Sequence, residues 1–512
     1  MSQDAISNNR RIAKNTLLLY LRTIIILLIN LYLSRVILEV LGIEDYGIYN
    51  AVGGAVAMFS LISGALSTSI SRYLTFELGK GNKERLQLVF STSINILLVI
   101  SILILALAEP LGIWFLNTQM NIPELRLQSA NWVFQSALIV FLINVISVPY
   151  NAAIIAHEHM SAFAYISILE ACFRFGVVLL LKYCFMAADT LILYSVLLVG
   201  VALIIRIIYG LYCNKNFDEC HYNFIFSKKL TKEMTSFAGW SFLTSTAYIF
   251  NTQGVNILIN LFFGVTLNAA RGIATQVDGA VMQFVNNFTM AINPQITKNY
   301  AQGDFVNMYK LVCLGAKYSF FLMLFFAIPL ILEIDQILFL WLGKNVPEHT
   351  AAFVSLGILG AIIDRIGITM TTACMATGKI RNYTIWVSCA GSLAFFLSWL
   401  FFLLGYAPES AYIAFIISYI VVNIVRLIMV KLMIQVSIIT FVREVVIKGC
   451  MTLVVAIILP LFFINYVEAS FIRLILTIVI CTISITTSIF FLGLNVNERK
   501  AIKGLVINRI RR

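Results

Sequence analysis

Long apolar stretches separated by short polar breaks limit the folds open to this chain more than any other feature. The hydrocarbon core of a bilayer is about 30 Å thick, so a helix that crosses it needs roughly 20 apolar residues. Fourteen such stretches are found along the 512 residues. Their approximate limits are 16–39, 47–76, 88–116, 128–155, 163–186, 191–213, 237–263, 271–296, 310–340, 351–375, 384–405, 411–432, 450–467 and 472–494. Each is predicted to be a membrane-spanning α-helix, because lipid offers no partner to unpaired backbone groups.

The composition points to the same class of protein. The chain is 60% hydrophobic and 12% charged, whereas soluble proteins are about 45–50% apolar and about 25% charged. So few polar residues cannot coat a water-facing surface. The composition excludes a secreted disulfide scaffold, a disordered chain, a cytosolic enzyme and a nucleic-acid-binding domain. No nucleic acid is therefore expected as a partner, despite a net charge of +12.

The basic residues between the stretches predict the orientation of the chain. With a cytoplasmic amino terminus, the inner connections hold 23 Lys and Arg and the outer ones hold 4. Cytoplasmic loops of membrane proteins carry such an excess of basic residues. A shift of the count by one span would destroy this separation, so the pattern favours fourteen spans and places both termini in the cytoplasm.

Small-residue landmarks recur along the chain and predict an internal repeat. Gly54-Ala55-Val56 and Gly279-Ala280-Val281 stand at corresponding places in the second and eighth stretches. The turns Gly81-Asn82 and Gly303-Asp304 also correspond. Two halves of six helices each start on the same side of the membrane and form a parallel repeat, which places the pathway between the halves.

These patterns together predict an all-α integral membrane protein with 14 transmembrane helices. Two pseudo-symmetric six-helix lobes are followed by two C-terminal helices, and the N and C termini are cytoplasmic. The predicted divisions are an N-lobe over 1–213, a cytoplasmic amphipathic connector over 214–236, a C-lobe over 237–432, the last two helices over 433–494 and a basic cytoplasmic tail over 495–512.

Nine basic residues fall within the predicted spans, where each costs about 2.5–3.5 kcal/mol at a helix centre. Five of them lie toward span ends, where the side chain can extend to the interface; these are Arg72, Lys182, Arg206, Lys317 and Arg426. The others are Arg22, Arg35, Arg174 and Arg365. A charge that cannot reach water along the lipid is expected to face a wet cavity or to have a charged partner.

Two acidic residues accompany the deeper arginines. Glu170 and Arg174 are four residues apart on one helix face, so they are either a structural pair or part of a site. Asp364 and Arg365 are neighbours about 100° apart, so they are not expected to pair well locally and at least one needs a partner elsewhere. Glu170 and Asp364 are also the candidate ion-coupling residues.

The first span carries two arginines on different faces. Arg22, near the cytoplasmic side, is the first choice for binding a diphosphate, because a guanidinium group grips phosphate oxygens with two parallel hydrogen bonds. Arg35 has Glu39 four residues later and is predicted either to pair with it or to face the cavity.

Amide side chains form stripes along the seventh and eighth spans. The candidates for contact with a glycan are Gln253, Asn256, Asn260, Gln283 and Asn287. Hydrogen bonds between membrane helices are the alternative role for any one of them. Asp278 lies off this stripe and shares a face with Arg271, so it is interpreted as half of a packing pair.

With these features the chain resembles the Wzx-type polysaccharide and O-antigen flippases of the multidrug, oligosaccharidyl-lipid and polysaccharide exporter superfamily. The resemblance rests on Asn15-Thr16, the turn from Leu41 to Tyr49, the junction from Arg72 to Gly81, the segment from Pro149 to Glu158 and the plan of six, six and two spans. It implies two lobes, alternating access, and transport of an undecaprenyl-diphosphate-linked oligosaccharide to the outer leaflet of a bacterial inner membrane.

The predicted function is therefore a flippase for cell-surface polysaccharide assembly rather than an enzyme. The site for its diphosphate would use Arg22, Arg35, Arg72, Arg174 and Arg365. Its partners would be the lipid-linked oligosaccharide and membrane lipids, with a polysaccharide polymerase as a further partner. No cofactor or metal is expected, and H⁺ and Na⁺ are both open as coupling ions.

Two alternatives stand beside it. A multidrug or cation antiporter of the same superfamily would need a buried carboxylate in its first lobe, for which Glu170 is the candidate. A membrane glycosyltransferase or glycan polymerase would need a sizeable loop with clustered acids or histidines, and the loops here are short.

Overall fold

The architecture is helical throughout the part of the chain that the structure describes. This computed structural model describes residues 3–57, 59–118, 122–184, 189–225, 227–263, 265–342, 346–496 and 498–500. The side chains of Arg35 and Asn260 lie outside the described residues, as do those of residues 3–14. No strand occurs within the described ranges. The prediction of an all-α chain is confirmed.

The chain divides into two compact units. Unit 1 comprises Met1–Ser245 and Thr297–Gly303, and unit 2 comprises Thr246–Ile296 and Asp304–Arg512. The chain passes between the units three times: within α7 (Lys228–Phe263), within α8 (Val265–Ala301), and at the turn between Gly303 and Asp304. The two compact units are divided at other residues than the predicted lobe limits at 213, 237 and 432. Those limits remain predictions.

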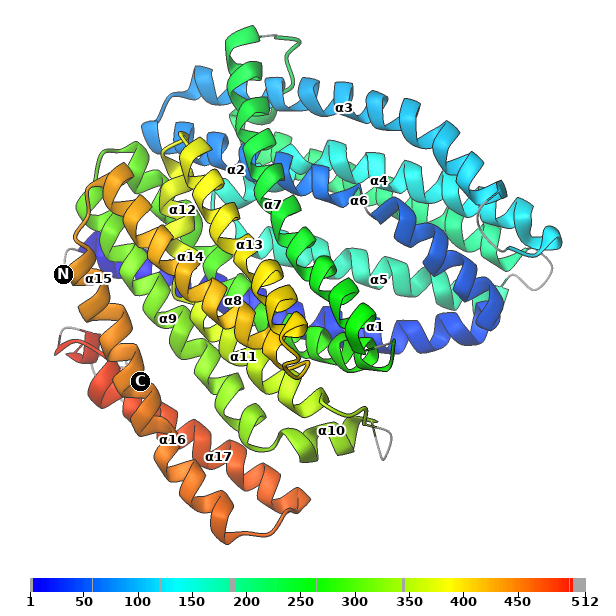
Figure 1. The fold of residues 1–512 in the computed structure, drawn as a ribbon. Coiled ribbons are helices and arrows are strands. Elements are labelled where there is room, and N and C mark those ends of the chain that lie inside the picture. The colour runs from blue at the N-terminus through cyan, green and yellow to red at the C-terminus, as the bar shows by residue number, and fades with distance from the viewer. Residues whose placement is uncertain are drawn as a thin grey trace, which may run out of the picture. The chain divides into compact units, whose positions relative to one another are not determined.

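Unit 1 holds the first six long helices (Figure 1). They are α1 (Gln3–Ala57), α2 (Ser60–Lys80), α3 (Lys83–Thr118), α4 (Leu127–Ala156), α5 (Met160–Cys184) and α6 (Thr190–Asn216). Helix α4 packs on α2, α3 and α6, and α1 packs on α5. The helices bury Val89, Phe90, Leu97 and Leu138 completely.

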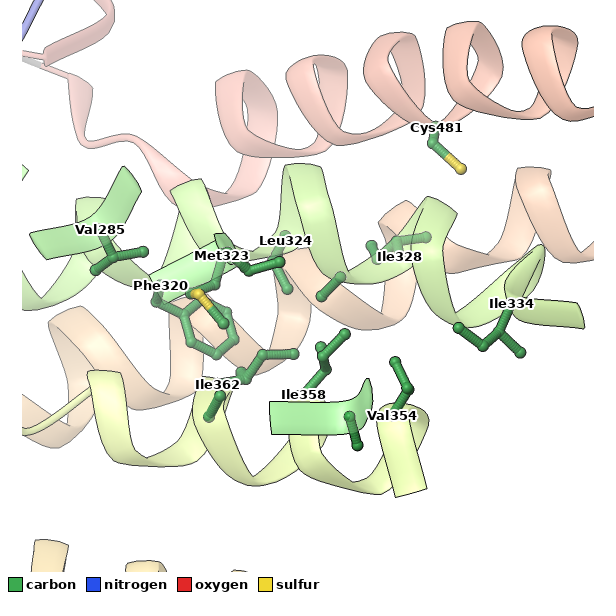
Figure 2. Close-up of a cluster of buried hydrophobic side chains, with 14 of the residues drawn as sticks. Val285, Phe320, Met323, Leu324, Ile328, Ile334, Val354, Ile358, Ile362 and Cys481 are labelled. Atoms are coloured by element: carbon green, nitrogen blue, oxygen red, sulfur yellow. The ribbon is translucent and has the colours of Figure 1, made fainter. Parts of the chain in front are cut away.

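Unit 2 contains the remaining helices. They are α9 (Phe305–Leu332), α10 (Ile334–Leu342), α11 (Thr350–Arg365), α12 (Ile368–Ala376), α13 (Arg381–Leu403), α14 (Ser410–Ile434), α15 (Ile438–Phe441), α16 (Lys448–Tyr466) and α17 (Phe471–Ser488). Val285, Leu324, Val354 and Ile358 belong to a buried cluster that joins α8, α9 and α11, and Cys481 of α17 reaches the same cluster (Figure 2).

Helix α17 is fastened to α9 by a buried ion pair. Arg473 donates from Nε to Glu333 Oε1 at 3.0 Å and from Nη2 to Glu333 Oε2 at 2.8 Å. Thr477 donates to the same carboxylate at 2.7 Å. Glu333 follows the end of α9, and its side chain is 0% exposed. The last two helices of the chain therefore dock on unit 2 through charge as well as through apolar packing.

A second ion pair fixes the other end of this docking. Lys317 of α9 donates to both carboxylate oxygens of Glu498, at 2.8 and 2.7 Å. The side chain of Lys317 is only 3% exposed. The prediction that Lys317 extends along lipid to the interface is wrong, because a carboxylate 181 residues later in the chain reaches it instead.

Ten of the described helical segments are long and apolar enough to cross a membrane. These ten segments support the prediction of a multi-pass membrane protein. The exact number of fourteen membrane spans stays a prediction. The other four predicted spans fall in α1, α2, α7 and α8, which are the least hydrophobic of the long helices. These helices stand at corresponding positions of the predicted repeat, and two of them, α7 and α8, carry the predicted amide stripes.

Three predicted spans prove to be interrupted. The span over 47–76 is divided between α1, which ends at Ala57, and α2, which begins at Ser60. Earlier in α1 the helix is kinked at Gly42, whose φ of 78° is a left-handed conformation that favours glycine. The span over 310–340 breaks at Glu333, and the span over 351–375 breaks at Ile366 and Gly367. The last two breaks coincide with buried charged residues.

The predicted amphipathic connector over 214–236 is not a separate helix. Helix α6 continues to Asn216, a short 3-10 turn covers Asp218–Cys220, and α7 begins at Lys228. The segment between them is held along α3 by side chains: Asn95 donates to Ile225 O at 3.1 Å, and Asn223 N donates to Ser91 Oγ at 3.3 Å. Polar residues on α3 thus bind the connector backbone in an extended form.

The Glu333–Arg473 pair gives a prediction about stability. Arg473→Gln should lower the free energy of unfolding by about 3–5 kcal/mol, because it leaves a buried carboxylate without its cation. The measurement is thermal unfolding of the purified protein in detergent. Lys83→Gln is the control, since it breaks the exposed Lys83–Asp218 pair and should change stability by about 1 kcal/mol or less. Equal melting temperatures for the two variants would contradict the prediction.

Candidate functional site

The interior of unit 1 contains a cavity lined by one ion pair. Arg174 Nη2 donates to Glu170 Oε1 at 2.6 Å, one turn apart on α5. Both residues line a cavity of about 320 Å³, together with Asn144, Ser136 and Ser195 from α4 and α6. The predicted pairing of Glu170 with Arg174 is confirmed. Both side chains stay partly exposed, at 32% and 44%, so the pair can still meet a solute.

Arg22 lies near the same acidic residue. Its guanidinium group stacks on the ring of Phe163 at 4.6 Å, a cation–π contact that fixes the group without neutralising it. Its Nε is buried without a hydrogen-bond partner among the described residues, and the charge of Glu170 acts on it. In unit 1 Glu170 is thus bound to Arg174 and also acts through its charge on Arg22.

The other predicted arginines of unit 1 take different places. Arg72 lies over the rings of Tyr73 and Phe76, at 4.5 and 4.7 Å, and is partly buried rather than extended to the interface. Arg206 stacks on Tyr150 at 3.8 Å. The side chain of Arg35 lies outside the described residues, so its pairing with Glu39 stays a prediction; Glu39 accepts a bond from Lys182 at 2.9 Å.

The turn between α4 and α5 is a cluster of polar contacts. Glu158 adopts a left-handed φ of 62°, and its buried carboxylate accepts from Lys298 at 2.7 Å. His157 contacts Glu219, and His159 Nδ1 contacts the Tyr212 hydroxyl at 2.9 Å. Burial, with the charges of His157 and Lys298, lowers the pKa of His159. Both histidines are engaged in local contacts, and the described residues hold no group of three metal-ligating side chains.

The interior of unit 2 holds the second charged cluster, at the break between α11 and α12. Arg426 of α14 donates from Nη1 to Asp364 Oδ1 at 2.9 Å and to the Asp364 carbonyl at 3.1 Å. Asn423 donates to the Ile363 carbonyl at 2.6 Å. These two side chains satisfy carbonyls freed where the helix stops. A Cβ at Gly367 would lie 2.0 Å from Asn423 Oδ1, so only glycine fits beside them.

Arg365 occupies the other side of the same carboxylate. Its Nη2 lies 3.2 Å from Asp364 Oδ2, so the prediction that these neighbours cannot pair is wrong; the side chains bend toward each other. The prediction that a partner elsewhere is needed is confirmed, because Arg426 supplies it. Arg365 Nη1 also donates to Asn286 Oδ1 of α8 at 3.0 Å.

Arg426 is the residue whose role the sequence analysis missed. It was predicted to extend to the interface, yet its side chain is 11% exposed and bound to Asp364. A signal was present: Asn423 and Arg426 stand three residues apart in an otherwise apolar helix, so they share a face. Two polar residues on one face of α14 indicate a partner inside the protein.

The predicted amide stripes are only partly available to a solute. Gln253 is exposed and accepts a bond from Asn256 at 3.0 Å. Gln283 is exposed, whereas Asn287 is 3% exposed. Asn260 lies outside the described residues. The role of these residues as glycan contacts stays a prediction.

The arrangement of long apolar helices and buried charged clusters is that of a membrane transporter. A MATE transporter in the bent conformation has a TM-score of 0.74 with this chain at 13% identity, over 84% of this chain and 96% of that one. A MOP superfamily transporter from Pyrococcus furiosus Vc1 (DSM3638), described by the words "reverse polarity of binding pocket", has a TM-score of 0.71 at 13% identity, with the same two coverages. At these identities the likeness shows the fold.

The sequence comparison gives the family. A family model described as "Polysaccharide biosynthesis protein" matches residues 12–300, and the chain belongs to this family. The uncharacterized membrane protein EpsK of Bacillus subtilis (strain 168) is 20% identical over 279 residues, which are 54% of each chain. The match therefore spans about half the length of that relative. The prediction of a polysaccharide-exporter type of multi-pass membrane protein, rather than an enzyme, is confirmed.

The two arginines beside Asp364 should differ when they are replaced. Arg426→Gln should destabilise the protein by about 3–5 kcal/mol, because Asp364 loses its interior partner and a freed carbonyl loses its donor. Arg365→Gln should cost less, since the Arg426–Asp364 pair remains. Thermal unfolding of both variants in the same detergent measures the difference. A loss for Arg365→Gln as large as that for Arg426→Gln would show that Arg365 is also structural.

Proposed function

We propose that this protein moves an undecaprenyl-diphosphate-linked oligosaccharide from the inner to the outer leaflet of the bacterial cytoplasmic membrane by alternating access. The family and the transporter fold support export of a polysaccharide component. Fourteen spans with cytoplasmic termini fit this role, since the cargo is made inside. The cargo would be a lipid-linked glycan of the kind used in O-antigen or other surface polysaccharides, with a polymerase acting on it after transfer.

One observation carries the proposal: guanidinium groups outnumber carboxylates in each interior cluster. Arg22 and Arg174 accompany Glu170 in unit 1, and Arg365 and Arg426 accompany Asp364 in unit 2. Each cluster therefore has one positive charge in excess. A diphosphate supplies compensating negative charge and accepts the paired hydrogen bonds that guanidinium groups donate.

The same charge balance weighs against a multidrug antiporter. Such an antiporter would need an unpaired carboxylate in its first lobe, whereas the candidate Glu170 is bound to Arg174 at 2.6 Å. The Pyrococcus furiosus transporter, whose binding pocket is described as having reverse polarity, shows that this fold is compatible with such a change of charge.

The proposal predicts the effect of removing these charges. Arg22→Gln, Arg174→Gln and Arg365→Gln should each slow translocation of a labelled polyprenyl-diphosphate glycan at least about tenfold, since one charge-assisted bond to the diphosphate is worth about 1.5–3 kcal/mol. Translocation is measured in proteoliposomes as loss of the label from access by an external glycan-cleaving enzyme.

Arg206→Gln is the matched control. Arg206 is also an interior arginine of unit 1, but it stacks on Tyr150 and belongs to neither cluster. Its variant should transport at the rate of the unchanged protein. Unchanged transport by all three test variants, each checked for folding by its melting temperature, would refute the site. Accumulation of a cationic dye in place of the glycan would favour the antiporter.

A further inference from the structure

Asp278 is an acidic residue of unit 2 whose surroundings differ from those of Glu170 and Asp364. Asp278 lies on α8, in the predicted span over 271–296, and its Oδ1 is buried without a hydrogen-bond partner. No hydrogen bond or ion pair to its carboxyl group occurs within the part of the chain that the structure describes. By contrast, Glu170 is bound to Arg174, and Asp364 is bound to two arginines.

The carboxyl group of Asp278 is held against the backbone of another helix. A Cβ built on Gly357 of α11 would lie 2.7 Å from Asp278 Oδ2 and 3.2 Å from Oδ1. The absence of a side chain at residue 357 is therefore what makes room for the carboxyl group. The helices that carry Asp278 and Gly357, α8 and α11, also contribute Val281, Val354 and Ile358 to the buried apolar cluster.

The nearest cation is directed elsewhere. Arg271 shares the helix face of Asp278, but its Nη2 donates to the Thr252 carbonyl of α7 at 3.2 Å. Its guanidinium group lies over the rings of Tyr412 and Phe415, at 5.6 and 5.5 Å. Arg271 therefore acts on Asp278 through its charge and not through a hydrogen bond, and the packing pair of the two residues stays a prediction.

Two titratable groups face Asp278 among the described residues. Arg271 acts on it through its charge, and Tyr412 of α14 is the other group within electrostatic reach. The Tyr412 hydroxyl is also buried without a partner. A neutral carboxyl group can be accommodated in such surroundings, whereas an ionised one without a bonded partner is costly to bury.

We propose that Asp278 is a proton-binding residue of the transport cycle, which takes up H⁺ in one conformation and releases it in another. The ligand is a proton, and the bond formed is the O–H of a carboxylic acid; release returns the carboxylate and gives the proton to water. The coupling role rests on the proposed transport function, while the protonation itself does not. Glu170 and Asp364 are already paired with arginines and hold those arginines in place.

Infrared difference spectroscopy of the purified protein tests the protonation directly. The unchanged protein should show the C=O stretch of a protonated carboxyl group that disappears as the pH is raised, and Asp278→Asn should lack this band at every pH. Asp364→Asn is the control and should keep it. A band unaffected by Asp278→Asn would overturn the proposal, as would a band that Na⁺ removes at constant pH.

Two glycine-to-alanine variants test the same proposal without changing Asp278, in case Asp278→Asn does not fold. Gly357→Ala places a methyl group against the carboxyl oxygens and should shift the pH midpoint of the band by about one unit or more. Gly279→Ala, on α8 beside Asp278, meets nothing within 4 Å and should leave the midpoint unchanged. Equal midpoints for the two alanine variants would contradict the placement of the proton.

The coupling is tested with the same labelled glycan in proteoliposomes. Asp278→Asn should still equilibrate the glycan between leaflets but should lose the acceleration that an imposed pH gradient gives to the unchanged protein. If the unchanged protein moves no glycan, the proposed function fails while the infrared result stands. If the variant still responds to the gradient, Asp278 is not the coupling residue.

Discussion

Compensation of charge inside the membrane is the constraint on which the rest of this structure depends. A charged side chain in the hydrocarbon region is costly unless it has a partner or water. Unit 2 meets this demand with pairs formed over long sequence distances: Glu333 with Arg473, Lys317 with Glu498, and Asp364 with Arg426. The first two join α9 to the C-terminal helices, and the third joins α11 to α14. These ion pairs therefore also fix the positions of the apolar helices that they join.

The charged pairs also explain where helices stop. A helix that ends within a membrane exposes carbonyl groups that lipid cannot satisfy. At the end of α11, Asn423 and Arg426 donate to the carbonyls of Ile363 and Asp364, and Gly367 leaves the space for them. Just after the end of α9, Arg473 binds the Glu333 side chain, and it also donates to the Val467 carbonyl at the end of α16. At α11 the helix break and the ion pair therefore depend on each other. The donors stabilise the freed carbonyls at the end of the helix, and the break places Asp364 beside Arg426.

Much of the architecture follows from the sequence because it depends on local periodicity. The length and apolarity of a stretch predict a helix, and the spacing of Glu170 and Arg174 predicts a pair on one face. The partner of a single buried charge does not follow, because spacing gives the face of a helix and not the helix that faces it. Arg426 and Lys317 were assigned to the interface for this reason, although each has a carboxylate far along the chain. The connector shows a related limit: its composition does not reveal that Ser91 and Asn95 of α3 bind its backbone.

The acidic residues inside unit 2 differ in how their negative charge is compensated. A carboxylate bound to two guanidinium groups, as Asp364 is, would leave both of them without a counter-charge if it took up a proton. It holds arginines in place and cannot easily exchange H⁺. A carboxyl group without a bonded partner, as Asp278 is, can change its protonation state with little rearrangement. In the proposed transport cycle the anionic cargo and the proton are therefore bound by different residues: the arginines of the two clusters bind the diphosphate, and Asp278 binds the proton.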